Sequence, residues 1–260
     1  MTQTTIQSGF ARSRSEALHP RLFPDAGWWC PSLQSPGGTR LHDLRGGNWG
    51  TLTNMDPASD WVVNGGRLAL DFDGSNDFVV ATTPLLSGSL SFSVWARGIP
   101  GNASTNYIAS IPIASSGSNG IDFRNPTNAQ ANLALSGTFV SINSGVDIRG
   151  SWSHLLCGYG NGVAFFYVNG ILVGSQAWAN GLNSLSSREL NLGRFGSFGS
   201  HSPVQLDDIR IFRTTLNAAD IRQLWQLGRG NMPMIRKRRY TEETAATTNR
   251  RRRLICGSNC

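Results

Sequence analysis

Residues 89–97 read Ser-Leu-Ser-Phe-Ser-Val-Trp-Ala-Arg, and polar residues alternate with apolar ones along most of this stretch. Successive side chains of a β-strand point to opposite sides, so Leu90, Phe92, Val94 and Ala96 share one face of an extended chain. Trp95 is the exception to the alternation. The stretch therefore predicts a β-strand with one face in a hydrophobic core.

Similar short strand patterns, separated by turn-forming residues, continue on both sides, from residue 66 to residue 213. Asn169-Gly170 predicts a hairpin with a type I′ turn. The turn cluster at 73–77 likewise predicts a hairpin, between Leu68–Phe72 and Phe78–Ala81. The other predicted strands are Tyr107–Ile113, Ile121–Arg124, Ala131–Leu135, Phe139–Ile142, Ser153–Tyr159, Val163–Val168, Ile171–Gly174, Glu189–Leu192 and Val204–Phe212.

One helix is predicted after the last strand, from Asn217 as the N-cap to Gly228 as the residue that ends it. Ile221, Leu224 and Trp225 form its apolar stripe. Roughly a dozen strands and one short helix predict an all-β fold, a two-sheet antiparallel jelly-roll sandwich with one short C-terminal helix and extended N- and C-terminal arms.

Composition, sequence pattern and charge together divide the 260 residues into three parts. Residues 1–20 are expected to be a flexible N-terminal arm, 21–228 the sandwich, and 229–260 an Arg-rich C-terminal tail. Within the sandwich, 21–60 are rich in Gly and Pro and are expected to be loops docked on the body. The tail contains nine basic and two acidic residues, so it carries the whole net charge of +7.

Composition excludes several classes of protein. The 30 Gly, 11 Pro and 15% charged residues argue against a helical bundle. No run of apolar residues is long enough for a transmembrane helix, so no membrane insertion is expected. The four cysteines are too few and too scattered for a disulfide framework or a zinc site. Cys157 lies in an apolar strand pattern and is expected to be a small buried hydrophobe.

Four stretches together resemble the LamG-like domains of the concanavalin A-like lectin/glucanase superfamily, across about residues 25–228. They are Leu70–Val79, Ser91–Ala96, Trp152-Ser153-His154 leading to Phe166–Gly170, and Leu206–Phe212 followed by Leu216–Leu227. The resemblance implies a concanavalin A-like sandwich. It also implies that His154 is a satisfied structural histidine.

Catalysis is not expected, and no catalytic residue is assigned. Glycoside hydrolysis needs two carboxylates about 5–10 Å apart across the sugar. The only glutamates are Glu16, Glu189, Glu242 and Glu243, and Glu189 has no acidic neighbour two positions away. Asp71 and Asp73 alternate suitably but resemble the structural turn of the family. No Gly-x-Ser-x-Gly elbow is present.

The resemblance implies at most one cofactor, a structural calcium ion between the first and last strands. Carboxylates suit a hard cation, and the expected ligands are Asp73, Asp77, Asp207 and Asp208. The alternative is that these residues only shape turns and bond backbone amides. For glycan binding, the expected loop residues are Tyr107, Trp178, Asn180 and His201, with packing or solvated loop positions as the alternative.

The tail is the second informative feature. Its basic residues are Arg236, Lys237, Arg238 and Arg239, then Arg250, Arg251, Arg252 and Arg253. Such runs bind phosphate backbones, acidic protein surfaces or single-stranded nucleic acid. The alternative is a solvated tail.

LamG-like domains with an Arg-rich end resemble virion proteins of tailed bacteriophages. The first thirty residues lack the apolar segment of a secretion signal. The expected function is therefore a non-enzymatic structural or surface protein of a virion, made in the host cytoplasm and part of an oligomer. Its partners would be other virion proteins, a cell-surface glycan, or both. The alternatives are an extracellular cellular adhesion module and, third, a divergent glucanase.

Overall fold

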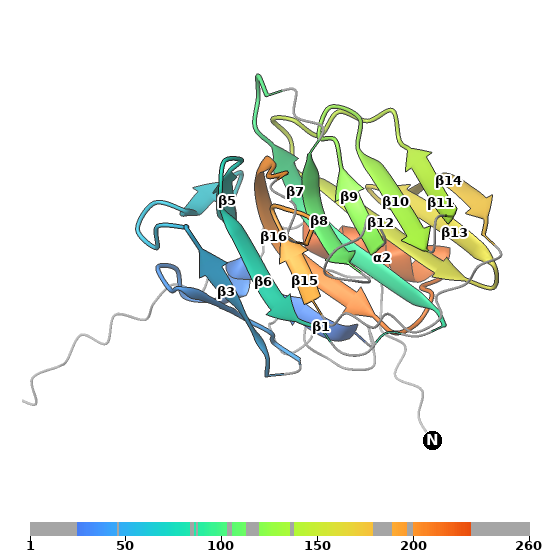
Figure 1. Cartoon of the computed structure of the whole chain (residues 1–260), viewed down its shortest axis with the longest axis horizontal. Helices are drawn as coiled ribbons and strands as arrows, with labels where there is room; N and C mark the ends of the chain where they lie inside the picture. The colour runs from blue at the N-terminus through green and yellow to red at the C-terminus, as the bar shows by residue number, and fades with distance from the viewer. Residues whose placement is uncertain are drawn as a thin grey trace, which may run out of the picture.

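The computed structural model describes residues 25–229 except 46, 84–85, 87, 103–105, 113–119, 136–137, 179–188 and 197–199. These residues form two eight-stranded sheets that face each other, with a helix outside one of them (Figure 1). The all-β two-sheet antiparallel sandwich expected from the sequence is confirmed. No helix in these residues is long and apolar enough to cross a membrane.

The sheet next to the helix, here called the helix-side sheet, has the order β14-β13-β12-β7-β16-β5-β4, and β1 also pairs with β16. Its strands are β1 (Asp25–Trp29), β4 (Trp61–Asn64), β5 (Arg67–Asp73), β7 (Leu90–Gly98), β12 (Ser153–Gly160), β13 (Val163–Val168), β14 (Ile171–Ala177) and β16 (Pro203–Phe212).

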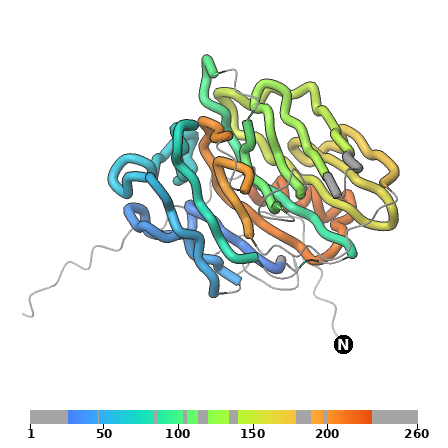
Figure 2. Tube along the Cα trace, viewed as in Figure 1, coloured from blue at the N-terminus to red at the C-terminus, as the bar shows by residue number. Residues whose placement is uncertain are grey.

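The second sheet lies nearer the viewer in Figure 1 and is here called the front sheet; its order is β11-β10-β9-β8-β15-β6-β3-β2. Its strands are β2 (Arg40–His42), β3 (Trp49–Thr53), β6 (Phe78–Thr82), β8 (Tyr107–Pro112), β9 (Gly120–Arg124), β10 (Gln130–Leu135), β11 (Thr138–Asn143) and β15 (Glu189–Leu192). Figure 2 shows the earliest strands at one edge of the sandwich and β10–β14 at the opposite edge.

The region 21–60, expected to be loops, instead supplies β1, β2 and β3 and a 3-10 helix, η1 (Pro31–Leu33). The many glycines and prolines of this region led to the expectation of loops. The strands form nevertheless, because β1 pairs with β16 and β3 pairs with β2 and β6. Gly50 is an example: it lies on β3 opposite Ala81 of β6, and a Cβ there would collide with Val79. Glycine at this position therefore permits β3 and β6 to lie close together.

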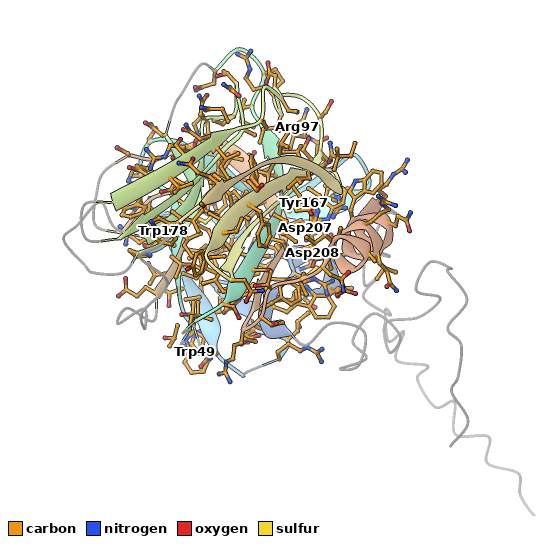
Figure 3. The ribbon with its side chains drawn as sticks, turned by 90° about the vertical axis from the view of Figure 1, so that its right-hand side faces the viewer. Trp49, Arg97, Tyr167, Trp178, Asp207 and Asp208 are labelled. Carbon is orange, nitrogen blue, oxygen red and sulfur yellow. The ribbon has the colours of Figure 1, made fainter. Side chains whose placement is uncertain are left out.

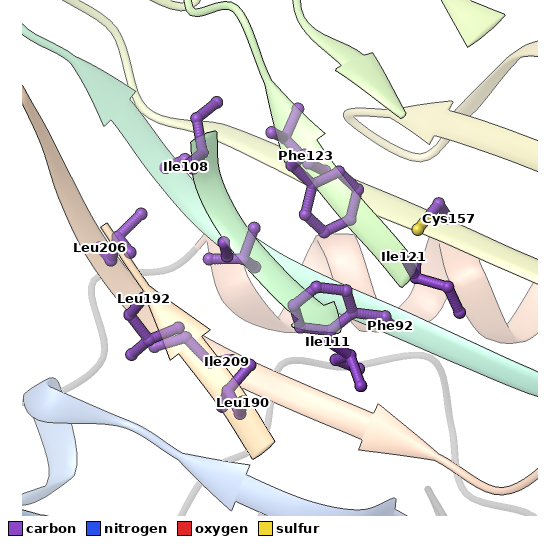
Figure 4. Packing of buried hydrophobic residues seen from close by; sticks show 14 of the residues in the cluster. Phe92, Ile108, Ile111, Ile121, Phe123, Cys157, Leu190, Leu192, Leu206 and Ile209 are labelled. Carbon is purple, nitrogen blue, oxygen red and sulfur yellow. The ribbon is translucent and has the colours of Figure 1, made fainter. Parts of the chain in front are cut away.

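The alternation along β7 has the predicted effect. Phe92 and Val94 lie in the core between the sheets, and the Phe92 ring stacks on Phe123 of β9 with the centroids 5.0 Å apart (Figure 4). Ser91 points the other way, and its Oγ accepts a hydrogen bond from the Leu216 N–H. Cys157 is buried in the same core, which confirms the prediction of a small hydrophobe. Burial raises the pKa of its thiol.

One predicted hairpin is confirmed. Asn169 and Gly170 have φ angles of 53° and 74°, and Val168 pairs with Ile171 on either side of them. Two positive φ angles in succession characterise the type I′ turn.

The other predicted hairpin is wrong. β5 belongs to the helix-side sheet and β6 to the front sheet, so residues 73–77 cross between the sheets. The turn chemistry itself is present, because Asp73 Oδ1 accepts hydrogen bonds from the N–H groups of Ser75 and Asn76. Such residues specify a reversal of the chain but not the sheet in which the next strand pairs. Phe72 and Val79 enter one core from opposite sheets.

The helix α2 (Ala218–Arg229) packs outside the helix-side sheet. Asn217 is its N-cap as predicted, since Oδ1 accepts from the N–H groups of Ala219 and Asp220, both at 2.9 Å. Ile221 and Leu224 pack against side chains of that sheet. Gly228 lies inside the helix rather than ending it. A Cβ at this position would collide with the Trp95 indole.

Candidate functional site: the polar face of the front sheet

Four strands of the front sheet turn a polar side chain away from the core. Asp122, Asn132, Ser110 and Asn191 each stand between two residues that are packed in the core, so strand alternation directs them outward. Strand register joins them into one row, because Asn132 lies opposite Asp122, Asp122 opposite Ser110, and Ser110 opposite Asn191. This set is here called the polar row.

The centre of the row is an ion pair. Arg124 donates from Nε and Nη2 to the two carboxylate oxygens of Asp122, at 2.8 and 2.9 Å. Asn132 Nδ2 also donates to Asp122 Oδ1, at 2.9 Å. Burial raises the pKa of Asp122, and the hydrogen bonds from Arg124 and Asn132 oppose that rise. Arg124 and Asn132 thus hold the carboxylate in one orientation.

Two amide atoms of the row have no partner. Asn132 Oδ1 and Asn191 Nδ2 are both buried and make no hydrogen bond to the described part of the chain. The other atom of each amide is engaged, since Asn191 Oδ1 accepts from Arg194 Nε at 3.2 Å. A buried polar group without a partner costs roughly 1–3 kcal/mol. The row thus contains one unpaired acceptor and one unpaired donor, which can bind hydroxyl groups once the residues that cover the two amides move aside.

An aromatic side chain lies beside this row. The Arg124 guanidinium lies 4.5 Å from the centre of the Tyr107 ring, and Phe195 packs on Tyr107 with the ring centroids 4.8 Å apart. Asn106 Nδ2 donates to the His201 carbonyl at 2.6 Å. Two of the expected glycan residues, Tyr107 and His201, therefore come together at one end of the sandwich. His201 itself is buried against Asp77 and Phe78.

Trp178 does not join them. Its side chain is buried in the core edge-on to Tyr159, and its backbone N–H donates to the Gly162 carbonyl. Tyr159 pairs with Leu90 at one end of β7, whereas His201 lies beside Pro203, near the other end, where Val204 pairs with Gly98. The two residues thus lie at opposite ends of the sandwich. Asn180, the fourth expected residue, lies outside the described residues, as do the eight basic residues 236–239 and 250–253.

The four expected calcium ligands do not converge either. Asp207 accepts from Arg67 Nη1 at 2.8 Å and from Ser32 Oγ at 2.8 Å. Asp208 accepts from Arg210 Nε at 2.7 Å and from Trp28 Nε1 at 2.6 Å. Figure 3 shows Asp207 and Asp208 near α2 and Trp178 far from it. No group of three or more His, Cys, Asp or Glu side chains in the described ranges could hold a metal ion.

The reason is a β-bulge in β16. Asp208 has a φ of 48°, and the pairing with β7 skips from Asp207 to Arg210. The extra residue turns both aspartates to the outer face while Leu206 and Ile209 stay in the core. There each carboxylate meets an arginine. Burial raises the pKa of Asp207. Burial also acts to raise the pKa of Asp208, but the charges of Arg210 and Arg67 and the hydrogen bonds from Arg210 and Trp28 together outweigh it and lower that pKa.

The carboxylates of Asp73 and Asp77 accept hydrogen bonds from backbone N–H groups of their own turn, as in the alternative in which these residues only shape the turn. The residues present therefore do not fit a calcium ion shared by the four carboxylates. His154 is buried, and desolvation lowers its pKa to about 3. It is not fully satisfied as expected, since Nδ1 has no hydrogen-bond partner in the described part of the chain.

The polar row was not identified from the sequence. Its four members stand in the patterns Ile-Asp-Phe, Ala-Asn-Leu, Ala-Ser-Ile and Leu-Asn-Leu, which indicate a residue facing out of a sheet. That local signal is the same for any solvated strand position. Only the order of β10, β9, β8 and β15 brings the side chains together.

Comparisons with known proteins agree with this fold. A family model described as the concanavalin A-like lectin/glucanases superfamily matches residues 72–222. No curated protein sequence is significantly similar to the chain.

Three solved structures illustrate the similarity. The binding domain of botulinum neurotoxin serotype G has a TM-score of 0.61 and 19% identity, covering 79% of this chain and 51% of that one. The binding domain of Paraclostridial mosquitocidal protein 1 has a TM-score of 0.63 and 13% identity, covering 78% and 52%. Trypanosoma rangeli sialidase in complex with sialic acid has a TM-score of 0.59 and 13% identity, covering 79% and 33%. The chain spans about half the length of the two binding domains.

Proposed function

Because the chain belongs to the concanavalin A-like lectin/glucanase superfamily, we propose that it is a non-catalytic glycan-binding module on the surface of a virus particle. The observation that carries the proposal is the polar row of the front sheet. Asn132 Oδ1 and Asn191 Nδ2 are an unpaired acceptor and an unpaired donor, both buried beside Tyr107, and a glycan would reach them by displacing the residues that cover them.

The arrangement of acidic residues supports a binding role over hydrolysis. Asp122 and Glu189 are the outward-facing acids of the described central strands β8, β9 and β15. They stand two strands apart, roughly 10 Å in the direction across the sheet, and are further offset along it. Both oxygens of Asp122 are already engaged by Arg124. This arrangement does not place two free carboxylates across one glycosidic bond.

The particle part of the proposal rests on charge. Residues 1–228 contain equal numbers of acidic and basic residues, whereas 229–260 carry the entire net charge of +7. A basic segment on a neutral sandwich is suited to attach the module to an anionic partner, which leaves the front sheet free to face outward.

A glycan array with the full chain tests the binding role. Asn132→Ala and Asn191→Ala should each weaken binding by roughly fivefold or more, the equivalent of one net hydrogen bond. Asn76→Ala, at an exposed turn, is the matched control and should bind normally. Thermal melting confirms that each variant folds. Absence of binding to any glycan, or equal binding by all three variants, would refute the proposal.

Co-sedimentation with particles tests the location. A chain that ends at residue 229 should have the same melting temperature as the full chain but should no longer sediment with virus particles. Changing Arg250–Arg253 to Gln should weaken the interaction more than Arg222→Gln, an exposed arginine of α2. The interaction should also weaken as salt rises. Equal sedimentation of the shortened chain would show that the segment is only a solvated end.

A further inference from the structure

The strand β14 forms one edge of the helix-side sheet. It pairs with β13 on one side, and no other described strand pairs with its far side. Its seven residues, Ile171–Ala177, are all exposed or half-buried. The edge of the sandwich that contains β14 is on the right in Figure 1 and faces the viewer in Figure 3. The far side of β14 therefore has backbone N–H and C=O groups that no described strand satisfies.

This edge lacks the features that commonly prevent edge-to-edge pairing, which are charged side chains, proline and short length. Residues 150–187 contain no Asp, Glu, Lys or Arg, and β14 contains no Pro. Other edge strands of the two sheets differ, because β2 carries the exposed Arg40 and His42, and β4 has only four residues. A bulge at Val173 interrupts β14, but Gly174–Ala177 stay regularly paired with β13.

Exposed apolar side chains gather at the same edge. Of the five large hydrophobic residues that are exposed in the described chain, three lie on β13 and β14, namely Val163, Ile171 and Leu172. Ile171 is the most exposed of the five, at 68%. Leu172 lies opposite Tyr167, and Tyr167 is the last side chain in this direction that packs against the cluster under α2. The helix therefore leaves the outer side of β14 uncovered, and such apolar surface is typical of an interface.

The absence of charge points to a second copy of the chain as the partner. A twofold axis places identical residues near one another, so any charge on β14 would face its own copy and repel it. Two neutral β14 strands meet no such repulsion, and in antiparallel pairing each can satisfy the backbone groups of the other. A partner with a charged surface would gain no attraction from this edge.

We infer that two copies of this chain pair through their β14 strands, antiparallel about a twofold axis, with Ile171 and Leu172 of each copy packed against the other copy. The two helix-side sheets then form one continuous sheet. The axis is perpendicular to that sheet, so both front sheets lie on the same side and the two polar rows face the same way. The use of both rows on one glycan-bearing surface, unlike the pairing itself, rests on the proposed function.

Sedimentation velocity of the full chain over a concentration series tests the pairing. The mass should rise from 28.1 kDa to twice that value and stop there. Pairing should persist at about 0.5 M salt, because strand hydrogen bonds and apolar contacts do not depend on charge attraction that salt screens. An association that disappears at this salt would be due to charge and would overturn the inference.

Ser175→Lys should leave the chain monomeric, because it sets two lysines near each other across the axis. Thr51→Lys is the matched control, since it adds the same charge at an exposed position of β3, at the opposite edge of the sandwich, and should still pair. Equal melting temperatures show that both variants fold. If Ser175→Lys does not fold, hydrogen exchange of the unaltered chain decides. The β14 amides should exchange more slowly as concentration rises, whereas those of β2 should not change.

A chain that stays at 28.1 kDa up to roughly 1 mM, the weak end of specific affinities, would overturn the inference. Pairing of Ser175→Lys equal to that of the unaltered chain would do the same, as would association without protection of β14. A mass that keeps rising beyond two copies would indicate open-ended association in place of a closed pair.

Glycan binding separates this inference from the proposed function. On a glycan-coated surface Ser175→Lys should bind roughly tenfold more weakly or worse, because it loses the second attachment, while its affinity for the free glycan should not change. Absence of all glycan binding would refute the proposed function and leave the measured mass and the protection of β14 as they are. Equal surface binding by a monomeric Ser175→Lys would refute the joint use of the two polar rows.

Discussion

The guanidinium carbon of Arg67 lies 4.0 Å from the centre of the Trp95 indole, while Nη1 of the same side chain donates to Asp207. Arg67 and Asp207 are both almost fully buried. The contact joins β5 to β7 across β16, over the outer face of the helix-side sheet. It exists because strand alternation after the core residue Leu206 directs Asp207 to the outer face.

Arg67→Met should therefore strongly destabilise the protein. It leaves the buried Asp207 carboxylate without its charge partner, a change that typically costs about 3–5 kcal/mol. Urea denaturation measures the loss. Arg149→Met is the control, because Arg149 forms a solvent-exposed pair with Asp147 and its loss should change little. Similar urea midpoints for the two variants would contradict the assignment of Arg67 as the charge partner of Asp207.

Stability should fall as pH decreases below about 6.5 because of His154. Burial lowers its pKa to about 3 in the folded protein. Between about pH 6.5 and pH 3, therefore, the imidazole binds a proton in the unfolded chain but stays neutral in the folded one. The stability contributed by the neutral form is complete above the unfolded pKa and is lost as pH falls toward 3. Between pH 6.5 and pH 5 the loss should be about 2 kcal/mol. His154→Phe should flatten this part of the profile, and an unchanged slope would exclude His154 as the cause.

Gly228→Ala should loosen α2 from the sheet, because the added Cβ would overlap the Trp95 indole. Overpacking of this kind typically costs about 1–3 kcal/mol. Gly38→Ala is the control, since its Cβ would meet only ordinary contacts at 3.7 Å or more. Hydrogen exchange of the α2 amides should speed up in Gly228→Ala alone. Equal protection in the two variants would argue against tight packing of Gly228.

Purified protein should release no reducing ends from β-glucans, because Asp122 is engaged by Arg124 and Glu189 stands two strands away. A reducing-sugar assay checks this. Release that disappears in both Asp122→Asn and Glu189→Gln would establish the hydrolytic alternative and refute the non-catalytic assignment.

Local sequence determined the parts of this structure that depend on neighbours within a few residues. Alternation along 89–97 predicted which side chains of β7 enter the core. Asn169-Gly170 predicted a type I′ turn, and Asn217 predicted the helix start. Each rests on backbone geometry that one short segment specifies by itself.

Tertiary structure alone decided how distant segments meet. It placed β5 and β6 in different sheets, and it directed Asp207 and Asp208 to separate arginines instead of to a shared ion. It also assembled the polar row from four strands of the front sheet. The physical reason is that strand order and bulges arise from pairing across the whole chain, while turn and strand signals are the same whichever partner is chosen.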